Sequence, residues 1–573
     1  MSQEDKKEMS YLKGMIEEMQ ESETKKNKKK NIIICILAIL ILMAAGFFGY
    51  RIYADYKEEQ FLKGVKLREI KVTPKVLEHK EKDVFTEAYQ QESQEQIDQQ
   101  KKKNYTIQKP LVVQNAYGTN TTALYYYGKT DRASYAVCTV EAPDAGAAVY
   151  KHTLKAKKKY STTHEYQIVG LSAGTRNKVT MEFFNEDKRA IEKQYFYVDI
   201  PEDDVIPRIL KKTRGSSAQK MEDGLFALLG HDKAQDANIY LYDNNGVNRG
   251  RMPLNKYRTD RLLFVGDDMA YSYDFNKIAM VNRLGKVTKT YDLGERYEFH
   301  HDFLYAKKQN KFICLVNDKE QDTIEDVVVS VDVRTGEVKE LIDFEDYFKT
   351  MRNLAYRPKK NTYGGTGLDW IHLNSMNMID DDSMIFSSRE QSTLIKMKNV
   401  FEKPEVDYLI HGGTVYNGTD YQKYMLKKEG SFVGQAGQHT ISVEHDKSLP
   451  KGQYYLYMFN NNYGYSATIK SFDWSMFPGT GTMKEGEKSM YYKYLVDENK
   501  RTYKLVQSFA IPYSPIVSSV EHMKNNISFG SGTSKTFGEY DKDGKLIYSF
   551  GYDADKYSYR VMKYNFEGYL FRD

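Results

Sequence analysis

The chain has 573 residues, and 84 lysines and arginines against 79 aspartates and glutamates leave a formal net charge of +5. This near balance argues against a nucleic-acid-binding protein, which normally carries a concentrated basic face. Three cysteines exclude a disulfide scaffold and a zinc module of four thiolates. Aromatic residues make up 13% of the chain and 48 residues are tyrosine, which favours β structure because strands accommodate aromatic side chains well.

One segment near the N-terminus is long and apolar enough to cross a membrane. Residues 31–50 carry no charge, and a helix of this length spans the roughly 30 Å hydrocarbon core of a bilayer. A cleaved signal peptide is the alternative, but its apolar region usually has only about 7–15 residues. We therefore expect an uncleaved signal anchor that crosses the cell membrane once, with residues 1–30 as a cytoplasmic tail and the rest outside. Five lysines precede the span and support this orientation by the positive-inside rule: Lys25, Lys26, Lys28, Lys29 and Lys30.

Two segments of different composition follow the span. Residues 51–108 are charged and Gln-rich, and we expect a helical or partly disordered stalk without chemistry. Residues 109–202 contain short runs in which apolar and polar residues alternate, such as SYAVCTVEAP and KQYFYVDIP. This alternation predicts a small β-sandwich domain of about 90 residues.

Residues 205–573 carry a repeat of hairpins. Polar turns with glycine join strands in LYDNNGVNRG at 241, VDVRTGEVKELIDF at 331 and YDKDGKLIYSF at 540, and such turns supply the positive φ that hairpins need. Apolar strands that end in polar clusters recur between them at periods of about 40–75 residues, which predicts four-stranded blades. At about 60 residues per blade the segment predicts a six-bladed β-propeller. A double sandwich fits a sustained repeat less well, so the expected class is an all-β propeller protein.

Three histidines lie in register with this repeat. His301, His372 and His439 stand 71 and 67 residues apart, close to one blade each. The first strand of every blade lines the central channel, so we expect the three imidazoles to meet near the axis. Asn374 follows His372 by two residues on the same strand face, and Arg389 ends the partner strand of that blade.

This cluster suits two kinds of ligand. Imidazoles, an amide and a guanidinium can bind a tetrahedral oxyanion such as sulfate or phosphate, whereas three neutral imidazoles can hold a divalent metal. Arg389 favours the oxyanion because a guanidinium repels a cation, and Asp302 and Asp369 are then candidates to orient the rings. The GxxxxGK[ST] and GxGxxG phosphate motifs do not occur, so nucleotide chemistry has no support.

At these residues the sequence resembles the bacterial arylsulfate sulfotransferases, the arylsulfotransferase family. The pieces NAYGTNTTAL and THEYQIVGLSAGT resemble the N-terminal domain of that family, so the resemblance covers about 110–573. The motifs that carry it in the propeller are DWIHLNS at 369–375, SSREQST at 387–393, HHD at 300–302, GQHT at 437–440 and YSPIV at 513–517.

The resemblance implies an enzyme that moves a sulfuryl group from an aryl sulfate to a phenolic acceptor without a nucleotide sulfate donor, a cofactor or a metal. It implies ping-pong kinetics through a sulfohistidine, a loose transition state stabilised by positioned charges, and a homodimer. Two other functions stay open: a non-catalytic extracellular propeller that binds an anionic or glycan ligand, and a metal-dependent hydrolase or lyase that uses the three histidines.

The family motifs assign roles residue by residue. The nucleophile corresponds to His439, and Tyr494 is a candidate tyrosine beside the sulfuryl group. Periplasmic members carry a cysteine pair shortly before the nucleophile, but residues 400–438 here contain no cysteine, so His445 remains a second candidate. The sulfate-binding groups correspond to His372, Asn374, Arg389 and His301, which we prefer to His300 because alternation along a strand lets only one of the two face the channel.

Overall fold

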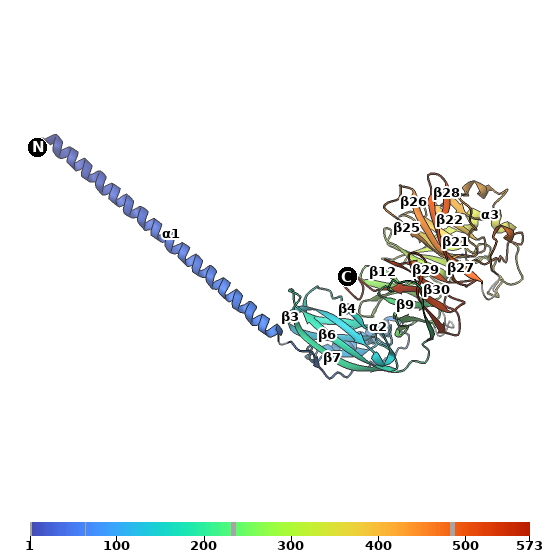
Figure 1. Cartoon of the computed structure of the whole chain (residues 1–573), viewed down its shortest axis with the longest axis horizontal. Coiled ribbons are helices and arrows are strands. Elements are labelled where there is room, and N and C mark those ends of the chain that lie inside the picture. The colour runs from blue at the N-terminus through green and yellow to red at the C-terminus, as the bar shows by residue number, and fades with distance from the viewer. Residues whose placement is uncertain (1–2, 64, 231–236, 362, 482–486, 573) are drawn as a thin grey trace.

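The computed structural model describes residues 3–63, 65–230, 237–361, 363–481 and 487–572. Within this part of the chain, a long N-terminal helix precedes a small β domain and a larger ring of β-sheets (Figure 1). The expected all-β architecture, a sandwich followed by a propeller, is confirmed.

Helix α1 (Gln3–Lys63) extends away from the two β domains (Figure 1). Its stretch Lys7–Tyr53 contains a strongly apolar window, none of which is buried against the rest of the described chain. Side chains such as Leu37 and Ile41 are exposed there, and a bilayer would cover them. The predicted apolar helix is therefore present, at a place near the N-terminus that also suits a signal sequence.

Residues 51–108 differ from the stalk that the sequence predicts. The extended part ends with α1, and strand β1 (Arg68–Glu69) already pairs in parallel with strand β7 of the small domain. Helix α2 (Glu87–Lys101) then packs on that domain and buries Ile97 completely beside Leu111. The stalk prediction is wrong for this part because isolated apolar side chains in a Gln-rich sequence give no periodic signal.

The small domain is a β-sandwich whose two halves share one long strand. Strand β3 (Leu124–Glu141) pairs with β2 and β5 near its start and with β4 and β6 toward its end. Buried and part-exposed side chains alternate along its second half, as expected for a strand with one face on a core. The other strands are β2 (Leu111–Gln114), β4 (Tyr150–Thr153), β5 (Ser161–Ile168), β6 (Thr175–Phe184) and β7 (Ala190–Ile200).

The ring is a six-bladed β-propeller of four- and five-stranded sheets. Blade one holds β9 (Leu225–Leu229), β10 (Asn238–Tyr242), β11 (Asn248–Pro253) and β33 (Arg560–Tyr564). Blade two holds β12 (Leu263–Val265), β13 (Asp268–Asp274), β14 (Lys277–Asn282) and β15 (Val287–Asp292). Blade three holds β16 (Tyr297–Ala306), β17 (Lys311–Asp318), β18 (Val327–Asp332) and β19 (Val338–Asp343), and α3 (Phe344–Leu354) follows it.

Blades four to six complete the ring. Blade four holds β20 (Leu373–Met378), β21 (Ser383–Ser388), β22 (Thr393–Lys398) and β23 (Glu405–Ile410). Blade five holds β24 (Lys427–Lys428), β25 (His439–Glu444), β26 (Gln453–Asn460), β27 (Lys488–Asp497) and β28 (Thr502–Pro512). Blade six holds β29 (Ser519–His522), β30 (Asn526–Ser531), β31 (Thr536–Asp541), β32 (Leu546–Asp553) and β8 (Arg208–Arg214).

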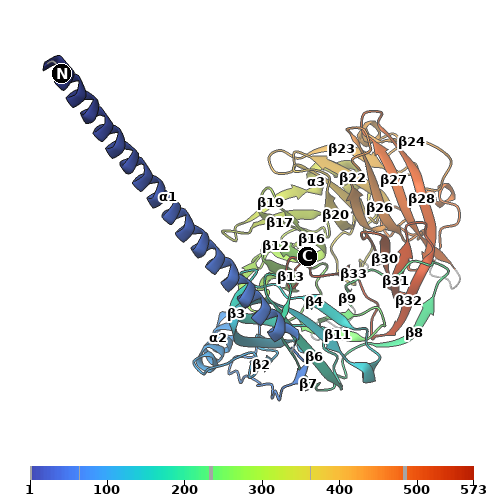
Figure 2. The same cartoon turned by 60° about the vertical axis from the view of Figure 1, so that its left-hand side comes forward.

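Two strands from opposite ends of the domain close the ring. Strand β33, near the C-terminus, pairs with β9 and contacts β29 of the last blade, so it is the inner strand of blade one. Strand β8, which precedes blade one in the sequence, pairs with β32 as the outer strand of blade six. Figure 2 shows the sandwich beside the sheets that contain β9, β11 and β12.

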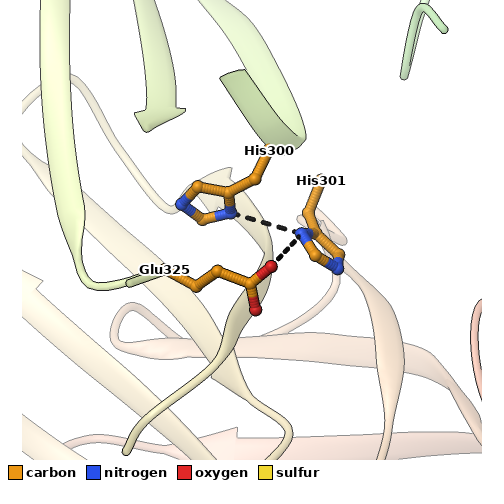
Figure 3. Close-up of side chains that lie close together, drawn as sticks. All are labelled: His300, His301 and Glu325. Atoms are coloured by element: carbon orange, nitrogen blue, oxygen red, sulfur yellow. Dashed lines mark hydrogen bonds and ion pairs between the residues drawn. The ribbon is translucent and has the colours of Figure 1, made fainter. Parts of the chain in front are cut away.

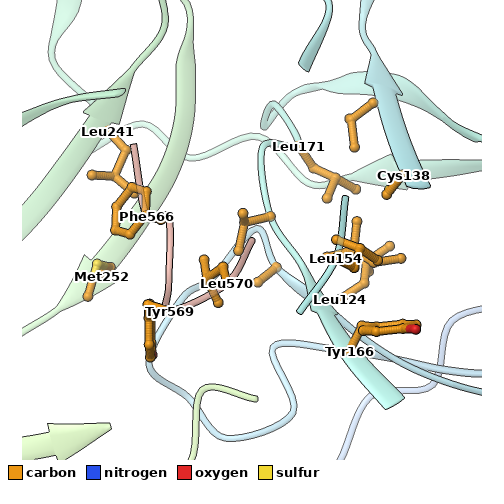
Figure 4. Close-up of a cluster of buried hydrophobic side chains, with 14 of the residues drawn as sticks. Leu124, Cys138, Leu154, Tyr166, Leu171, Leu241, Met252, Phe566, Tyr569 and Leu570 are labelled. Atoms are coloured by element: carbon orange, nitrogen blue, oxygen red, sulfur yellow. The ribbon is translucent and has the colours of Figure 1, made fainter. Parts of the chain in front are cut away.

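The two β domains share one hydrophobic core (Figure 4). Leu124 of the sandwich and Leu241 of blade one belong to the same buried cluster as Tyr569 and Leu570 near the C-terminus. The backbone N–H of Lys155 in the sandwich also donates a hydrogen bond to the Leu570 carbonyl at 2.9 Å. The C-terminal segment therefore joins the propeller to the sandwich.

A buried ion network connects the blades at the axis. Asp302 accepts hydrogen bonds from Arg560 Nη1 at 2.8 Å, from Arg261 Nε at 2.6 Å and from the Met376 backbone N–H at 3.1 Å. Burial alone would raise the pKa of Asp302, but the two guanidinium groups lower it to about 2. Because Arg560 lies on β33, Asp302 on β16 and Met376 on β20, the network links ring closure to blades three and four.

We expect Arg560→Met to destabilise the propeller, because it removes one of the two cations from the fully buried Asp302. Breaking a buried ion pair costs on the order of 3–5 kcal/mol, so the midpoint of thermal unfolding should fall clearly. Arg208→Met on the second closing strand is the control, since its side chain is 82% exposed and lies 3.8 Å from Asp553. Equal midpoints for the two variants would contradict the stabilising role of the network.

Candidate functional site

A cavity of about 690 Å³ lies where the inner strands of the propeller begin. Five of the seven side chains predicted as site residues line it, which means that the repeat brings them together as expected. They are His300, His301, His372, Arg389 and His439. Asn374 and Tyr494 lie outside the lining of this cavity.

The backbone is irregular at the same place in three successive blades. His301 has φ +58°, His372 has φ +50° and Thr440, beside the third histidine, has φ +51°. The pairing of each inner strand with its neighbour shifts register there. A left-handed residue interrupts the alternation of side chains, so His300 and His301 both line the cavity. The prediction that only one of this pair faces the channel is therefore wrong for this strand.

His439 is held as a neutral imidazole with a defined tautomer. Its Nδ1 lies 2.8 Å from Asn461 Oδ1 and 3.1 Å from the Gly437 carbonyl oxygen. Both partners are acceptors, so Nδ1 carries the hydrogen, and Nε2 accepts a hydrogen bond from the Val517 N–H at 3.2 Å. Burial, assisted by the positive charges of His372 and Arg389, lowers the pKa of His439 to about 3. Asn461 does not belong to the histidine repeat. In the sequence, only the polar cluster at the end of β26 indicates that it lies near the site.

His372 has the opposite charge state. Its Nδ1 lies 2.8 Å from Asp369 Oδ2 and 2.5 Å from Glu325 Oε2. Burial and Arg389 disfavour its protonated form, but these two carboxylates outweigh them and raise its pKa to about 9. Asp369 thus orients His372, as the sequence suggests. Asp302 does not orient a ring, because Arg261 and Arg560 occupy its carboxylate.

Glu325 is a site residue that the sequence did not indicate. Its side chain is 2% exposed and contacts both His301 and His372. The Oε1 atom lies 3.3 Å from His301 Nδ1 (Figure 3). The Tyr363 hydroxyl donates a hydrogen bond to the same oxygen at 2.8 Å. Burial alone would raise the pKa of Glu325, but His301 and His372 hold it well below its usual value. Glu325 lies in the loop between β17 and β18, where no repeat position marks it.

Arg389 supplies a permanent positive charge to the cavity. Its backbone N–H donates to the His372 carbonyl at 3.0 Å, which fixes the start of the loop beside that histidine. Its Nη2 lies 3.3 Å from Glu390 Oε2, and Glu390 in turn accepts from the Thr468 N–H at 2.6 Å. Arg389 also lines the cavity, and a guanidinium can bind an anion through several N–H groups.

Asn374 and Tyr494 form hydrogen bonds with residues near the cavity and do not line it. Asn374 Nδ2 donates to the Gln438 carbonyl at 2.8 Å, directly before His439 in the chain. Tyr494 is fully buried in a core that blades four and five share, and its hydroxyl donates to Gln435 Oε1 at 3.0 Å. The prediction of a tyrosine beside the transferred group therefore fails for Tyr494, because its side chain points into that core.

Tyr559 is a tyrosine that contacts two of the site histidines. Its ring centre lies 5.3 Å from that of His301 and 6.5 Å from that of His439, and the Arg258 guanidinium lies 4.1 Å from it. Its hydroxyl donates to the Asn374 carbonyl at 2.8 Å. No sequence pattern indicates this role, because Tyr559 precedes the closing strand β33 rather than an expected inner strand. Further aromatic side chains line the cavity: Tyr257, Phe275, Phe299, Tyr363, Tyr463, Tyr465 and Tyr557.

Two overlapping groups of side chains in the described chain could hold a metal ion. Their donor atoms lie within 4.8 Å of one another in each group. The first group is His300, His301 and Glu325, and the second is Glu325, Asp369 and His372.

Taken together, the cavity combines a neutral imidazole, a protonated imidazole and a guanidinium within walls rich in aromatic rings. The two cations favour an anion with several oxygens, and the aromatic walls favour a planar organic group. The neutral imidazole of His439 carries its lone pair on Nε2, where the Val517 N–H donates to it, and such a lone pair is the requirement for a nucleophile. The chemistry available is therefore group transfer on an aromatic ester of an oxyanion.

Comparison with known proteins gives the family. The profile described as Arylsulfotransferase (ASST) matches residues 211–566, and the profile described as Arylsulfotransferase Ig-like domain matches residues 111–198. The first match covers more than half of the chain and almost the whole propeller. A search of curated proteins returns no match.

Solved structures that align with the chain are distant. A putative 6-phosphogluconolactonase from Bacteroides uniformis is 10% identical, with 75% of this chain and 99% of that chain covered and a TM-score of 0.33. An auxiliary nutrient binding protein from Bacteroides ovatus is 9% identical, with 75% and 94% covered and a TM-score of 0.32. At these values the likeness carries no argument about function.

The family profiles and the site agree on one chemistry. The matched range contains the cavity, the histidines that line it and Arg389. The chain therefore belongs to the arylsulfotransferase family and is a sulfotransferase enzyme.

Proposed function

We propose that the protein transfers a sulfuryl group from an aryl sulfate to a phenol by a ping-pong reaction, with His439 carrying the group between the two half-reactions. The observation that carries this proposal is the neutral His439 in a cavity with protonated His372 and Arg389. A neutral nucleophile beside two cations is what attack on an anionic sulfate ester requires.

In the first half-reaction, His439 Nε2 attacks the sulfur and the bond from sulfur to the aryl oxygen breaks. The aryl oxide leaves with the electron pair of that bond, and the sulfuryl group remains on Nε2. Charge on the sulfuryl oxygens is stabilised by Arg389 and His372, which are already in place before the reaction. Asn461 and Gly437 accept hydrogen bonds from the Nδ1–H group and stabilise the positive charge that develops on the ring.

In the second half-reaction, a phenol oxygen attacks the same sulfur and the bond from sulfur to Nε2 breaks. The phenol must lose its proton, and we assign its acceptance to His301. The Nδ1 of His301 faces Glu325 while its other ring nitrogen points away from that carboxylate (Figure 3). Glu325 would stabilise the imidazolium that forms, in the manner of a carboxylate behind a general base.

The backbone amide of Val517 contacts the nucleophilic nitrogen of His439 before substrate binds. Its N–H occupies the Nε2 lone pair of His439 at 3.2 Å, so attack on sulfur requires this hydrogen bond to open. Val517 and Ser518 have φ values of +56° and +93°, which are strained for residues with a side chain. Because this backbone is strained, breaking the hydrogen bond of the Val517 amide costs less free energy than it would in a relaxed strand.

We also propose that α1 anchors the enzyme in the cell membrane, with the propeller on the outer side. The lysines before the apolar span, Lys25 to Lys30, support this orientation. The substrates, small aryl sulfates and phenols, would then be extracytoplasmic.

We expect His439→Ala to abolish the release of nitrophenol from p-nitrophenyl sulfate, both with and without phenol. The wild-type protein without acceptor should release about one equivalent per site, because the sulfuryl group stays on His439. Mass spectrometry of the peptide that contains His439 should then show one added sulfuryl group.

His445→Ala is the matched control, since His445 lies on the loop that follows the same strand and its Nε2 is 2.7 Å from the Ile379 carbonyl oxygen. This variant should keep the burst and the turnover. If His445→Ala lost the burst and His439→Ala kept it, the nucleophile assignment would be wrong. Absence of nitrophenol release in every form would favour a binding propeller instead.

We expect Arg389→Ala to lower kcat/KM for the donor by about 10²–10³-fold, the usual loss for a group that stabilises transition-state charge. Arg357→Ala is the control, because the Arg357 side chain is exposed and pairs with Asp322 at 2.6 Å. Steady-state kinetics of nitrophenol release measure both. A rate for Arg389→Ala close to that of Arg357→Ala would remove Arg389 from the sulfate site.

The pH dependence of the donor step should differ from that of an ordinary histidine enzyme. His439 stays neutral above its pKa of about 3, so protonation of the nucleophile should not slow the reaction as the pH falls through 6.5. His372 loses its proton above its pKa of about 9, so the rate should decline there. Asp369→Asn removes a charge that favours protonated His372, and this decline should move to lower pH. A wild-type rate that falls below pH 6.5 would contradict the assigned charge states.

A further inference from the structure

We propose that His300, His301 and Glu325 form a binding site for one divalent transition-metal ion such as Zn²⁺, and that this ion inhibits the acceptor half-reaction. The inhibitory part rests on the proposed function, whereas the binding part rests on the donor geometry alone. The site lies on the wall of the cavity, between the start of β16 and the loop that follows β17.

Two of the three donor separations match a tetrahedral ion, and all three donor atoms lie within 4.8 Å of one another. His300 Nδ1 lies 3.3 Å from His301 Nδ1, which lies 3.3 Å from Glu325 Oε1 (Figure 3). Zinc binds imidazole nitrogen and carboxylate oxygen at about 2.0–2.2 Å, and tetrahedral geometry then places neighbouring ligand atoms about 3.3–3.5 Å apart. Two imidazoles and a carboxylate leave a fourth position, which here would face the cavity.

The charge states also suit a cation. Neutral imidazole is the form that binds a metal, and the rings of His300 and His301 are both buried in the cavity wall. At most one hydrogen can lie between the two Nδ1 atoms, and a metal would engage both lone pairs. Glu325 brings a negative charge, and Asp369 would keep the proton of His372 in place at 2.8 Å when Glu325 turns to the ion.

Occupancy would block one proton transfer rather than the whole reaction. A metal on Nδ1 of His301 forces the ring hydrogen onto Nε2, so His301 could no longer accept the proton of the phenol. The nucleophile is untouched, because His439 belongs to neither group of side chains that could hold the metal. The cations Arg258 and Arg389, which line the same cavity, oppose the metal and favour weak, reversible binding.

The test uses the full-length protein, freed of metals with a chelator and then titrated with Co²⁺. We expect one equivalent to bind, with the intense visible absorption of tetrahedral Co²⁺, and Zn²⁺ to displace it. His300→Gln should weaken Co²⁺ binding at least about tenfold. The control His522→Gln should not, although His522 Nδ1 lies 2.7 Å from Glu444 and forms another His–Glu pair. Absent absorption at one equivalent, or equal affinity in His300→Gln and wild type, would overturn the site.

The kinetic arm separates inhibition from the proposed function. In the wild type, Zn²⁺ should leave the nitrophenol burst intact and slow turnover with phenol, and His300→Gln should lose this sensitivity relative to its own metal-free rate. Zn²⁺ that suppressed the burst equally would overturn the inhibition mode. If the chelated protein transfers no sulfuryl group while Co²⁺ still binds, the proposed function fails and the metal site stands. If the protein transfers the group but binds no Co²⁺, the metal site fails and the proposed function stands.

Discussion

The carboxylate of Asp302 is the point on which both the fold and the site depend. It joins Arg560 on the last strand to Arg261 before the second blade and to the backbone of Met376 on the fourth. Asp302 directly follows His301, and Arg560 directly follows Tyr559. The same ion pair that closes the ring therefore places a histidine and an aromatic wall of the cavity. A propeller without its final strand would lose the geometry of the site together with its stability.

The site is also assembled from strained backbone. Left-handed residues at His301, His372 and Thr440 each cost about 1–3 kcal/mol, and Glu325 has φ +62° as well. The strain recurs because each inner strand must turn its first side chains toward the axis and then return to regular pairing. Close packing in the blade cores and buried hydrogen bonds, such as that from Ile441 N to Ser375 Oγ at 2.9 Å, oppose it. The result is a set of side chains that is oriented before substrate arrives.

The sequence predicts the parts of this protein that repeat. Hairpin turns and apolar periodicity indicate the six blades, and histidines one blade apart indicate the cavity wall. Residues that do not belong to the histidine repeat cannot be predicted in this way. Glu325 and Asn461 follow the second strands of blades three and five, Tyr559 precedes β33, and only the closed ring brings all three to the histidines. His300 shows a second limit of prediction from the sequence. Side chains alternate between the two faces only along a regular strand, and the left-handed residue His301 interrupts that regularity.

The C-terminal segment has a consequence for the biogenesis of the enzyme. Tyr569 and Leu570 fill a core that also contains Leu124 of the sandwich, more than 440 residues earlier in the chain. During synthesis the sandwich emerges from the ribosome long before these side chains are added. Until Tyr569 and Leu570 are in place, that core is open to solvent and to proteases. The stability of the sandwich is therefore coupled to the completion of the propeller.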